Sequence, residues 1–162
     1  MTTTTISKTE QYRERLLKLY GDVKSWLANT DVEFLESEKE IKEFHAEPYT
    51  APELRLQDSE KIIIAEFEPK GWRIIGASGR VNIIGRYSSE ALVFLETGKK
   101  PQLVIREKLD NTLTSESVKA LLINEITEDG WYWLDNQRLG LVRLFSMTLL
   151  KGILEMVSDY GI

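Results

Sequence analysis

The chain has 162 residues, of which 42% are hydrophobic and 29% are charged, and its formal net charge is −5. It contains no cysteine and one histidine, His45, which excludes disulfide frameworks, thiolate nucleophiles, the usual Cys-rich zinc sites and any motif that needs two histidines. Because roughly 100 to 200 residues form one core, we expect residues 7–162 to form a single α+β domain. We expect residues 1–6 to be a disordered tail.

The longest apolar segment, residues 139–157, contains three charged side chains, Arg143, Lys151 and Glu155. Charges at this density are costly inside a bilayer, so we expect no contact with a membrane. The first residues are rich in threonine and lack the basic start and the apolar stretch of a secretory signal. We therefore expect a cytoplasmic protein.

A helix is predicted over residues 8–28. Ser7 followed by Glu10 matches the capping box that begins many helices, and apolar residues then recur at helical spacing. These apolar residues are Tyr12, Leu16, Leu19, Val23 and Trp26. We expect this face to be buried and the opposite face, which carries Lys18 and Asp22, to be solvated.

The acid-rich segment that follows, residues 31–47, has a weaker pattern. A short strand is favoured by three apolar residues, Val32, Phe34 and Leu35. Later in the segment, Ile41 and Phe44 favour a helical turn. Pro48 and Pro52 bracket a connection that we do not expect to be a central strand, because proline cannot donate to a strand ladder.

From residue 54 onward the chain becomes a series of short runs rich in β-branched and aromatic residues and separated by turn residues. The predicted strands are residues 54–57, 62–68, 72–77, 80–87, 91–96 and 103–108. Pro69-Lys70-Gly71 and Ser78-Gly79 are typical of tight turns. Short loops join antiparallel neighbours, so we expect an antiparallel β-meander of five to six strands.

Three further elements are predicted: a helix over residues 114–126, a short strand over residues 131–134 and a final helix over about residues 136–160, ended by Gly161. Apolar residues between 139 and 157 cover far more of the last helix than one sheet would bury. We therefore expect this helix to need two partners, the sheet and either the first helix or a second subunit. The fold class expected is α+β, with the N-terminal and C-terminal helices on one face of the meander.

Charge is unevenly distributed along the chain. Residues 31–68 hold 12 acidic and 4 basic side chains, whereas residues 69–108 hold 8 basic and 3 acidic ones. One interpretation is a set of charge pairs between neighbouring strands. The alternative is that basic residues, among them Arg73, Arg80 and Arg86, converge and bind an anion. The acidic balance of the whole chain argues against a nucleic-acid partner.

Asp58, Glu68 and Lys70 form the one group of residues with a catalytic pattern, D-x9-E-x-K. This pattern is similar to the motif of the PD-(D/E)XK nuclease family. The resemblance implies that the two acids hold a divalent metal and that the lysine positions the attacking water. The alternative is a solvated strand end, because Pro69 would interrupt a strand and Asp58 is typical of a hairpin turn.

Trp131-Tyr132-Trp133 is an unusual cluster in a chain with only 4 Trp residues. Alternation along a strand places Trp131 and Trp133 on one face, where they would belong to the core. The alternative is that these residues and Arg138 anchor a protein interface, since Trp, Tyr and Arg are frequent at the centre of interfaces.

Two other candidates lack the context that a functional site needs. The glycines between Gly76 and Gly79 precede a strand-like run rather than a helix, so they indicate a turn and not a phosphate-binding loop. His45 lies between Glu43 and Glu47, where a solvated histidine is the simpler interpretation than a metal ligand. We expect no cofactor and no metal.

From these observations we expect a non-enzymatic binding or interaction protein that forms a homodimer or binds a protein partner through the sheet or the aromatic cluster. Two alternatives remain open. One is the metal-dependent nuclease or phosphodiesterase described above. The other is a small-ligand carrier with a pocket between the sheet and the C-terminal helix.

Overall fold

The computed structural model describes residues 7–43, 47–74, 76–97, 126, 128–134 and 142–160. In this part of the chain a seven-stranded sheet has each strand antiparallel to its neighbour in sequence, in the order β1-β2-β3-β4-β5-β6-β7. The elements are α1 (Lys8–Trp26), β1 (Glu33–Ile41), β2 (Tyr49–Gln57), β3 (Ile63–Gly71), β4 (Arg80–Gly85), β5 (Ser89–Leu95), β6 (Gly130–Leu134), β7 (Val142–Leu144) and α4 (Met147–Ser158). The predicted α+β meander is confirmed, with more strands than expected.

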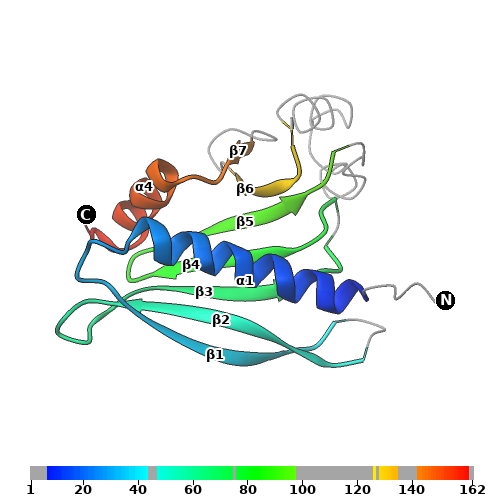
Figure 1. The fold of residues 1–162 in the computed structure, drawn as a ribbon, viewed down its shortest axis with the longest axis horizontal. Coiled ribbons are helices and arrows are strands. Elements are labelled where there is room, and N and C mark those ends of the chain that lie inside the picture. Colours follow the sequence, from blue (N-terminus) through cyan, green and yellow to red (C-terminus); the bar gives the residue numbers. More distant parts are fainter. Residues whose placement is uncertain are drawn as a thin grey trace.

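The first helix, α1, begins where its cap predicts. The Ser7 hydroxyl accepts a hydrogen bond from the backbone N–H of Glu10 at 3.1 Å. The helix lies across one face of the sheet, with α4 beside it at one end (Figure 1). Its buried side chains are Tyr12, Leu16, Leu19, Tyr20 and Val23, so the predicted apolar face is the one that covers the sheet.

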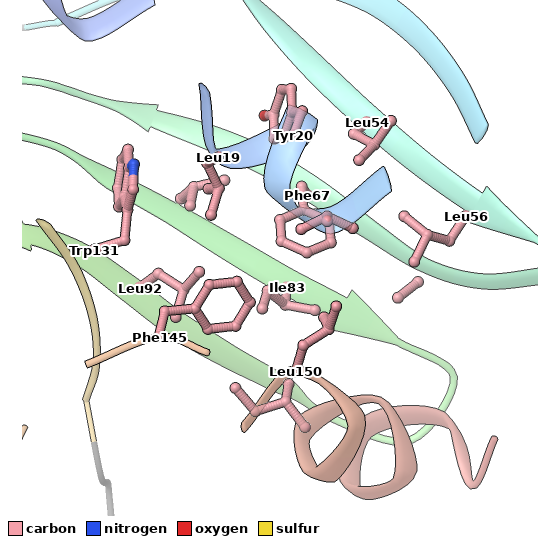
Figure 2. Packing of buried hydrophobic residues seen from close by; sticks show 14 of the residues in the cluster. Leu19, Tyr20, Leu54, Leu56, Phe67, Ile83, Leu92, Trp131, Phe145 and Leu150 are labelled. Atoms are coloured by element: carbon pink, nitrogen blue, oxygen red, sulfur yellow. The ribbon is translucent and has the colours of Figure 1, made fainter. Parts of the chain in front are cut away.

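The core lies between the sheet and these two helices. Leu54, Phe67 and Ile83 are cross-strand partners in successive strands, and Leu92 and Trp133 are partners in β5 and β6. All five are buried because partners in register share one face of a sheet. Figure 2 shows Trp131, Leu92 and Phe145 along one side of this buried cluster and Leu54 and Leu56 along the other.

The expectation for the segment around Pro52 was wrong. Residues 49–57 form β2, which lies between β1 and β3 and includes Pro52, and Ile41 ends strand β1 rather than forming a helical turn. Pro52 pairs with Glu38 of β1, whereas the pairing of β2 with β3 begins only at Leu54. Proline is tolerated here because this stretch of β2 is paired on one side only.

The expectation for the segment after β3 was also wrong. Strand β3 continues through Pro69 to Gly71, with an irregular register between these two residues that accommodates the proline. Residues 72–77 do not form the predicted strand: within the described residues of this loop, only an isolated bridge joins Ile74 and Ala77.

The final helix is shorter and less apolar than predicted. The chain forms β7 at residues 142–144, and α4 begins only at Met147, where the Ser146 hydroxyl accepts from the backbone N–H of Leu149 at 3.2 Å. One side of α4 is buried through Leu150, Ile153, Leu154 and Val157. The other side is exposed, with Met147 at 43% and Met156 at 48%. The expectation that this helix is apolar on nearly every side was therefore wrong, although α4 contacts both the sheet and α1, the two partners expected within the chain.

Several predictions lie outside the described residues. These are the tail at residues 1–6, the strand at 103–108, most of the helix at 114–126, the start of the final helix at 136–141 and its end at Gly161. In the part of the chain that the structure describes, no helix has the length and the apolar character needed to cross a membrane.

Candidate functional site

A cleft of about 370 Å³ lies between α1 and strands β5, β6 and β7, and we refer to it as the α1–β6 cleft. One wall is a single face of α1, formed by Arg15, Lys18, Leu19, Asp22 and Trp26. The other wall comes from the sheet and the residues around it, namely Phe94, Glu128, Asp129, Gly130, Trp131, Leu144 and Phe145. The size lies at the lower end of the range for small-molecule sites, roughly 300 to 1,000 Å³.

Four aromatic rings in two pairs line the α1–β6 cleft. Phe94 and Trp131 are cross-strand partners, and their ring centroids lie 5.4 Å apart at an interplanar angle of 84°. Trp26 and Phe145 lie 5.5 Å apart at 60°. Edge-to-face and tilted contacts of this kind hold the rings in place. The cleft therefore has aromatic walls that are positioned before any ligand arrives.

Arg15 links the two walls of the cleft. Its guanidinium carbon lies 4.0 Å from the centroid of the Phe94 ring, and its Nη1 lies 3.5 Å from a carboxylate oxygen of Glu96. The backbone carbonyl of Arg15 accepts a hydrogen bond from the indole N–H of Trp131 at 3.1 Å. One residue of α1 therefore orients both aromatic side chains of the Phe94–Trp131 pair.

The charges at the cleft differ between its two walls. On α1, Lys18 and Asp22 form an exposed ion pair at 3.4 Å. On the sheet side, the Asp129 carboxylate accepts from the backbone N–H and the hydroxyl of Thr97 at 2.6 and 3.0 Å. The side chain of Glu128 is exposed and has no hydrogen bond or ion pair with the described residues. Both of these acidic residues belong to the sheet side of the cleft.

Of the predicted interface anchors, Trp131 and Trp133 belong to the core, at 7% and 9% exposure. Trp131 also lines the α1–β6 cleft. The indole N–H of Trp133 donates to a carboxylate oxygen of Glu90 at 2.8 Å. Arg138 lies outside the described residues. Trp131 thus connects the predicted aromatic cluster to the cleft.

The three residues that resemble a nuclease motif are not brought together. Asp58 lies in the turn between β2 and β3, where its carboxylate accepts from the backbone N–H groups of Glu60 and Ile62. Asp58 therefore lies beside the start of β3, whereas Glu68 lies five residues further along that strand. Five residues of extended strand span about 17 Å. A single metal ion cannot bridge that distance.

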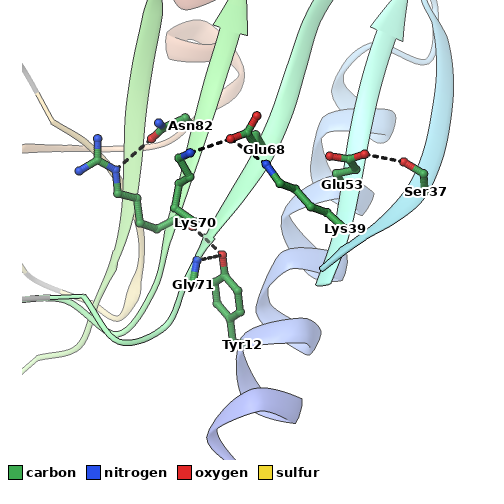
Figure 3. A network of polar contacts seen from close by, with 9 residues as sticks. Tyr12, Ser37, Lys39, Glu53, Glu68, Lys70, Gly71 and Asn82 are labelled. Atoms are coloured by element: carbon green, nitrogen blue, oxygen red, sulfur yellow. Dashed lines mark hydrogen bonds and ion pairs between the residues drawn. The ribbon is translucent and has the colours of Figure 1, made fainter. Parts of the chain in front are cut away.

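Glu68 and Lys70 form part of a surface network instead (Figure 3). The Glu68 carboxylate pairs with Lys70 at 2.7 Å and with Lys39 at 2.9 Å. Hydrogen bonding to Lys70, and then to Lys39, lowers the pKa of Glu68 from its ordinary value. Arg55 and Glu66, which are cross-strand partners, pair at 3.0 Å. The two pairs that join different strands, Lys39–Glu68 and Arg55–Glu66, both lie within the acidic segment of residues 31–68 and do not join it to the basic segment.

Two of the three arginines of the predicted anion site, Arg80 and Arg86, lie at opposite ends of β4. Arg80 begins β4 and Arg86 follows its end, so about 20 Å of extended chain separates them. The Nε of Arg80 donates to the side-chain oxygen of Asn82 at 2.9 Å. Arg73 lies in the loop after β3, with its guanidinium carbon 5.2 Å from the centroid of the Trp72 ring.

A metal site is not found in the described ranges, which contain no group of three or more His, Asp or Glu side chains able to hold an ion. His45 lies outside them. Glu43 has structural partners: its carboxylate accepts from the Tyr49 hydroxyl at 2.9 Å and from the backbone N–H of Arg73 at 3.0 Å.

Sequence reasoning missed most of the cleft. Arg15, Trp26, Phe94 and Phe145 were not predicted to share a site, and Lys18 and Asp22 were predicted only as a solvated face. A signal did exist in the recurrence of Arg15, Asp22 and Trp26 along one stripe of α1.

Comparison with models of known protein families, with curated proteins and with solved structures finds no match for this chain.

Proposed function

We propose that the protein is a non-enzymatic binding protein that holds a small, largely apolar ligand in the α1–β6 cleft. The observation that carries this proposal is the pair of aromatic contacts, Phe94 with Trp131 and Trp26 with Phe145, that line the cleft. Small-molecule sites are typically concave and apolar, with a few charged groups that fix the ligand's orientation. The proposal joins two sequence-based expectations, the ligand carrier and the aromatic binding cluster.

The position of the cleft differs from that expected for a carrier. It lies beside α1 and reaches only Leu144 and Phe145, which precede the C-terminal helix. Part of the cleft wall belongs to the core, because Trp131 and Phe145 are only 7% and 8% exposed. Ordering such walls on binding costs little conformational entropy, which supports affinity for a small ligand.

We do not extend the proposal to a homodimer. That expectation depended on a final helix that is apolar on nearly every side, and α4 is amphipathic. A nuclease is not proposed either, because Asp58 lies at the opposite end of β3 from Glu68 and Lys70.

Nuclear magnetic resonance of the four tryptophan indole N–H groups tests the proposal. Trp26 and Trp131 line the cleft, whereas Trp72 and Trp133 do not, so the chain contains its own internal controls. The protein is screened against water-soluble fragments of two kinds, aromatic and aliphatic. Each kind is represented by cationic, neutral and anionic members. We expect at least one class to shift the Trp26 and Trp131 signals saturably while the Trp72 signal stays in place.

A cleft-filling variant provides the matched comparison. Leu144 is 42% exposed and lines the cleft, so Leu144→Trp reduces the cleft volume at little cost to the core. Leu17→Trp, at an exposed position of α1 outside the lining, is the control. We expect only Leu144→Trp to weaken the fragment shifts. Fragments that shift no cleft indole, or that bind both variants equally, would contradict the proposal.

A further inference from the structure

We propose that the ligand of the α1–β6 cleft is an uncharged aromatic compound of one or two rings. This inference rests on the proposed binding function and names the class of ligand for the same site. Three features of the cleft carry it: most of its charged side chains already have partners, two of its rings are partly exposed, and its volume is small.

The charged side chains that line the cleft are mostly bound within the protein. The Nη1 atom of Arg15 lies 3.5 Å from a carboxylate oxygen of Glu96, and the two side chains are only 17% and 18% exposed. Lys18 pairs with Asp22 at 3.4 Å. The Asp129 carboxylate accepts two hydrogen bonds. An ionic ligand would have to compete with these contacts, whereas an uncharged ligand leaves them intact.

Glu128 is the exception among the charged residues of the lining. Its side chain is exposed and has no hydrogen bond or ion pair with the described residues. One carboxylate in contact with water attracts a cation only weakly, because solvent and salt screen the interaction. An ionic ligand would also lose hydration against Trp131 and Phe145, which belong to the core. These contacts therefore favour a ligand without a formal charge.

Trp26 and Phe94 are the rings of the cleft that are open to a ligand. Both are partly exposed, whereas their ring partners, Phe145 and Trp131, are buried. The guanidinium of Arg15 already lies over the Phe94 ring at 4.0 Å. No cation lies over Trp26 among the residues that the structure describes. Trp26 is therefore the ring against which we expect the ligand to pack.

The arrangement of the rings favours an aromatic ligand over an aliphatic one. The Phe94–Trp131 pair meets at 84° and the Trp26–Phe145 pair at 60°. A flat ring that enters between the two pairs adds further edge-to-face or tilted contacts of the same kind. Such contacts contribute free energy beyond the burial of apolar area, so an aromatic ligand gains more than a saturated ligand of the same size.

The volume of the cleft limits the size of the ring system. About 370 Å³ is close to the lower end of the range for small-molecule sites, roughly 300 to 1,000 Å³. Leu19 and Leu144 complete the apolar lining beside the rings. A compound of one or two rings fits this space better than a larger fused system.

The test compares benzyl alcohol with three compounds of similar size: cyclohexylmethanol, benzylamine and benzoate. The first has a saturated ring, and the other two carry a positive and a negative charge at neutral pH. Binding is followed through the indole signals of Trp26 and Trp131. We expect benzyl alcohol to bind at least about threefold more tightly than cyclohexylmethanol, because only the aromatic ring gains from ring–ring contacts. We expect a similar margin of at least about threefold over benzylamine and benzoate, whose charges lose hydration in the cleft.

Two variants of Trp26 test the role of its ring. Trp26→Leu removes the ring and keeps an apolar side chain, whereas Trp26→Phe keeps an aromatic ring at the same position. Binding to both is followed through Trp131, and an unchanged Trp133 signal before ligand is added shows that the fold is kept. We expect Trp26→Leu to reduce the preference for benzyl alcohol over cyclohexylmethanol by at least about twofold, and Trp26→Phe to retain it.

The outcomes separate this inference from the proposed function. If cyclohexylmethanol binds as tightly as benzyl alcohol, the aromatic class is wrong, and if a charged compound binds more tightly, the absence of charge is wrong. In either case the binding function stands. If Trp26→Leu keeps the full preference, the assignment of Trp26 is wrong. If no fragment of any kind shifts Trp26 or Trp131, both proposals are wrong.

Discussion

The guanidinium of Arg15 stacks on the ring of Phe94 at 4.0 Å and so joins α1 to β5 across the α1–β6 cleft. The same residue accepts the indole N–H of Trp131 through its backbone carbonyl. The side chain fixes one aromatic residue and the main chain fixes the other. A substitution of Arg15 therefore separates the two roles, since it removes only the side-chain contacts.

Replacing Arg15 with glutamine is expected to lower the free energy of unfolding by about 1 to 2 kcal/mol, because the stacking on Phe94 and the ion pair with Glu96 are both lost. Urea denaturation measures the change. Lys18→Gln, which breaks only an exposed pair on the same helix, is the control and should cost less than about 0.5 kcal/mol. Equal midpoints for Arg15→Gln and the wild type would show that the stack adds no stability.

Tyr12 joins α1 to the ends of β3 and β4. Its hydroxyl donates to the carbonyl of Arg80 at 2.6 Å and accepts from the N–H of Gly71 at 3.0 Å. Burial raises the pKa of this hydroxyl above its ordinary value. Tyr12→Phe leaves a buried N–H without its partner, so we expect a loss of about 1 to 3 kcal/mol in chemical denaturation.

Tyr87→Phe is the control for Tyr12→Phe, because Tyr87 is 64% exposed. We expect this second variant to lie within about 0.5 kcal/mol of the wild type. A similar small effect for Tyr12→Phe would mean that water replaces the lost hydroxyl.

Two glycine substitutions are expected to have opposite effects. A Cβ atom at Gly85 would lie 2.4 Å from the carbonyl oxygen of Val157, so Gly85→Ala must displace the end of α4 and cost about 1 to 3 kcal/mol. Gly152, inside α4, has nothing within 4 Å of that position. Gly152→Ala should stabilise the protein by about 0.5 to 1 kcal/mol through helix propensity. Thermal unfolding compares the two, and a tolerated Gly85→Ala would show that α4 does not pack closely on β4.

The Glu68 network predicts a dependence of stability on pH. Because Lys70 and Lys39 lower the pKa of Glu68 in the folded state, the pairing stabilises the protein at pH values above the ordinary value of 4.5. This stabilisation is lost as the pH falls below 4.5 and through the lower pKa of the folded state. Glu68→Gln should therefore lose less stability than the wild type between about pH 6 and pH 3.

Glu60→Gln, in the exposed turn after β2, serves as the control for the pH experiment. Its loss of stability over the same pH range should follow that of the wild type. If Glu68→Gln also follows the wild type, the pairing of Glu68 with the two lysines contributes nothing to folding.

The parts of the fold that could be predicted are those with local signals. Ser7 marks the start of α1, and apolar spacing marks the face of α1 that is buried. Strand β1 was harder to predict because two of its acids point toward α1 at the edge of the sheet. Glu38 pairs with Arg13 of that helix, and Glu36 pairs with Lys24. These ion pairs place acidic residues on the face of β1 that is turned toward α1. A prediction from the hydrophobic pattern expects apolar residues on that face.

The final helix was overestimated because one apolar run spans two elements. Val142 is buried in β7, whereas Leu150 and Leu154 are buried in α4, so the run is apolar without being one helical face. Ser146 was a usable start signal, since serine is a common helix cap. The α1–β6 cleft was harder still, because Trp26 and Phe145 meet only through the packing of α1 against residues 119 positions later in the chain.

The most direct test of the central claim is a crystal structure of the protein with the fragment that shifts the Trp26 and Trp131 signals most. The account predicts density for that fragment between the Trp26–Phe145 and Phe94–Trp131 pairs. A cleft that holds only water, with the fragment bound elsewhere on the molecule, would contradict it.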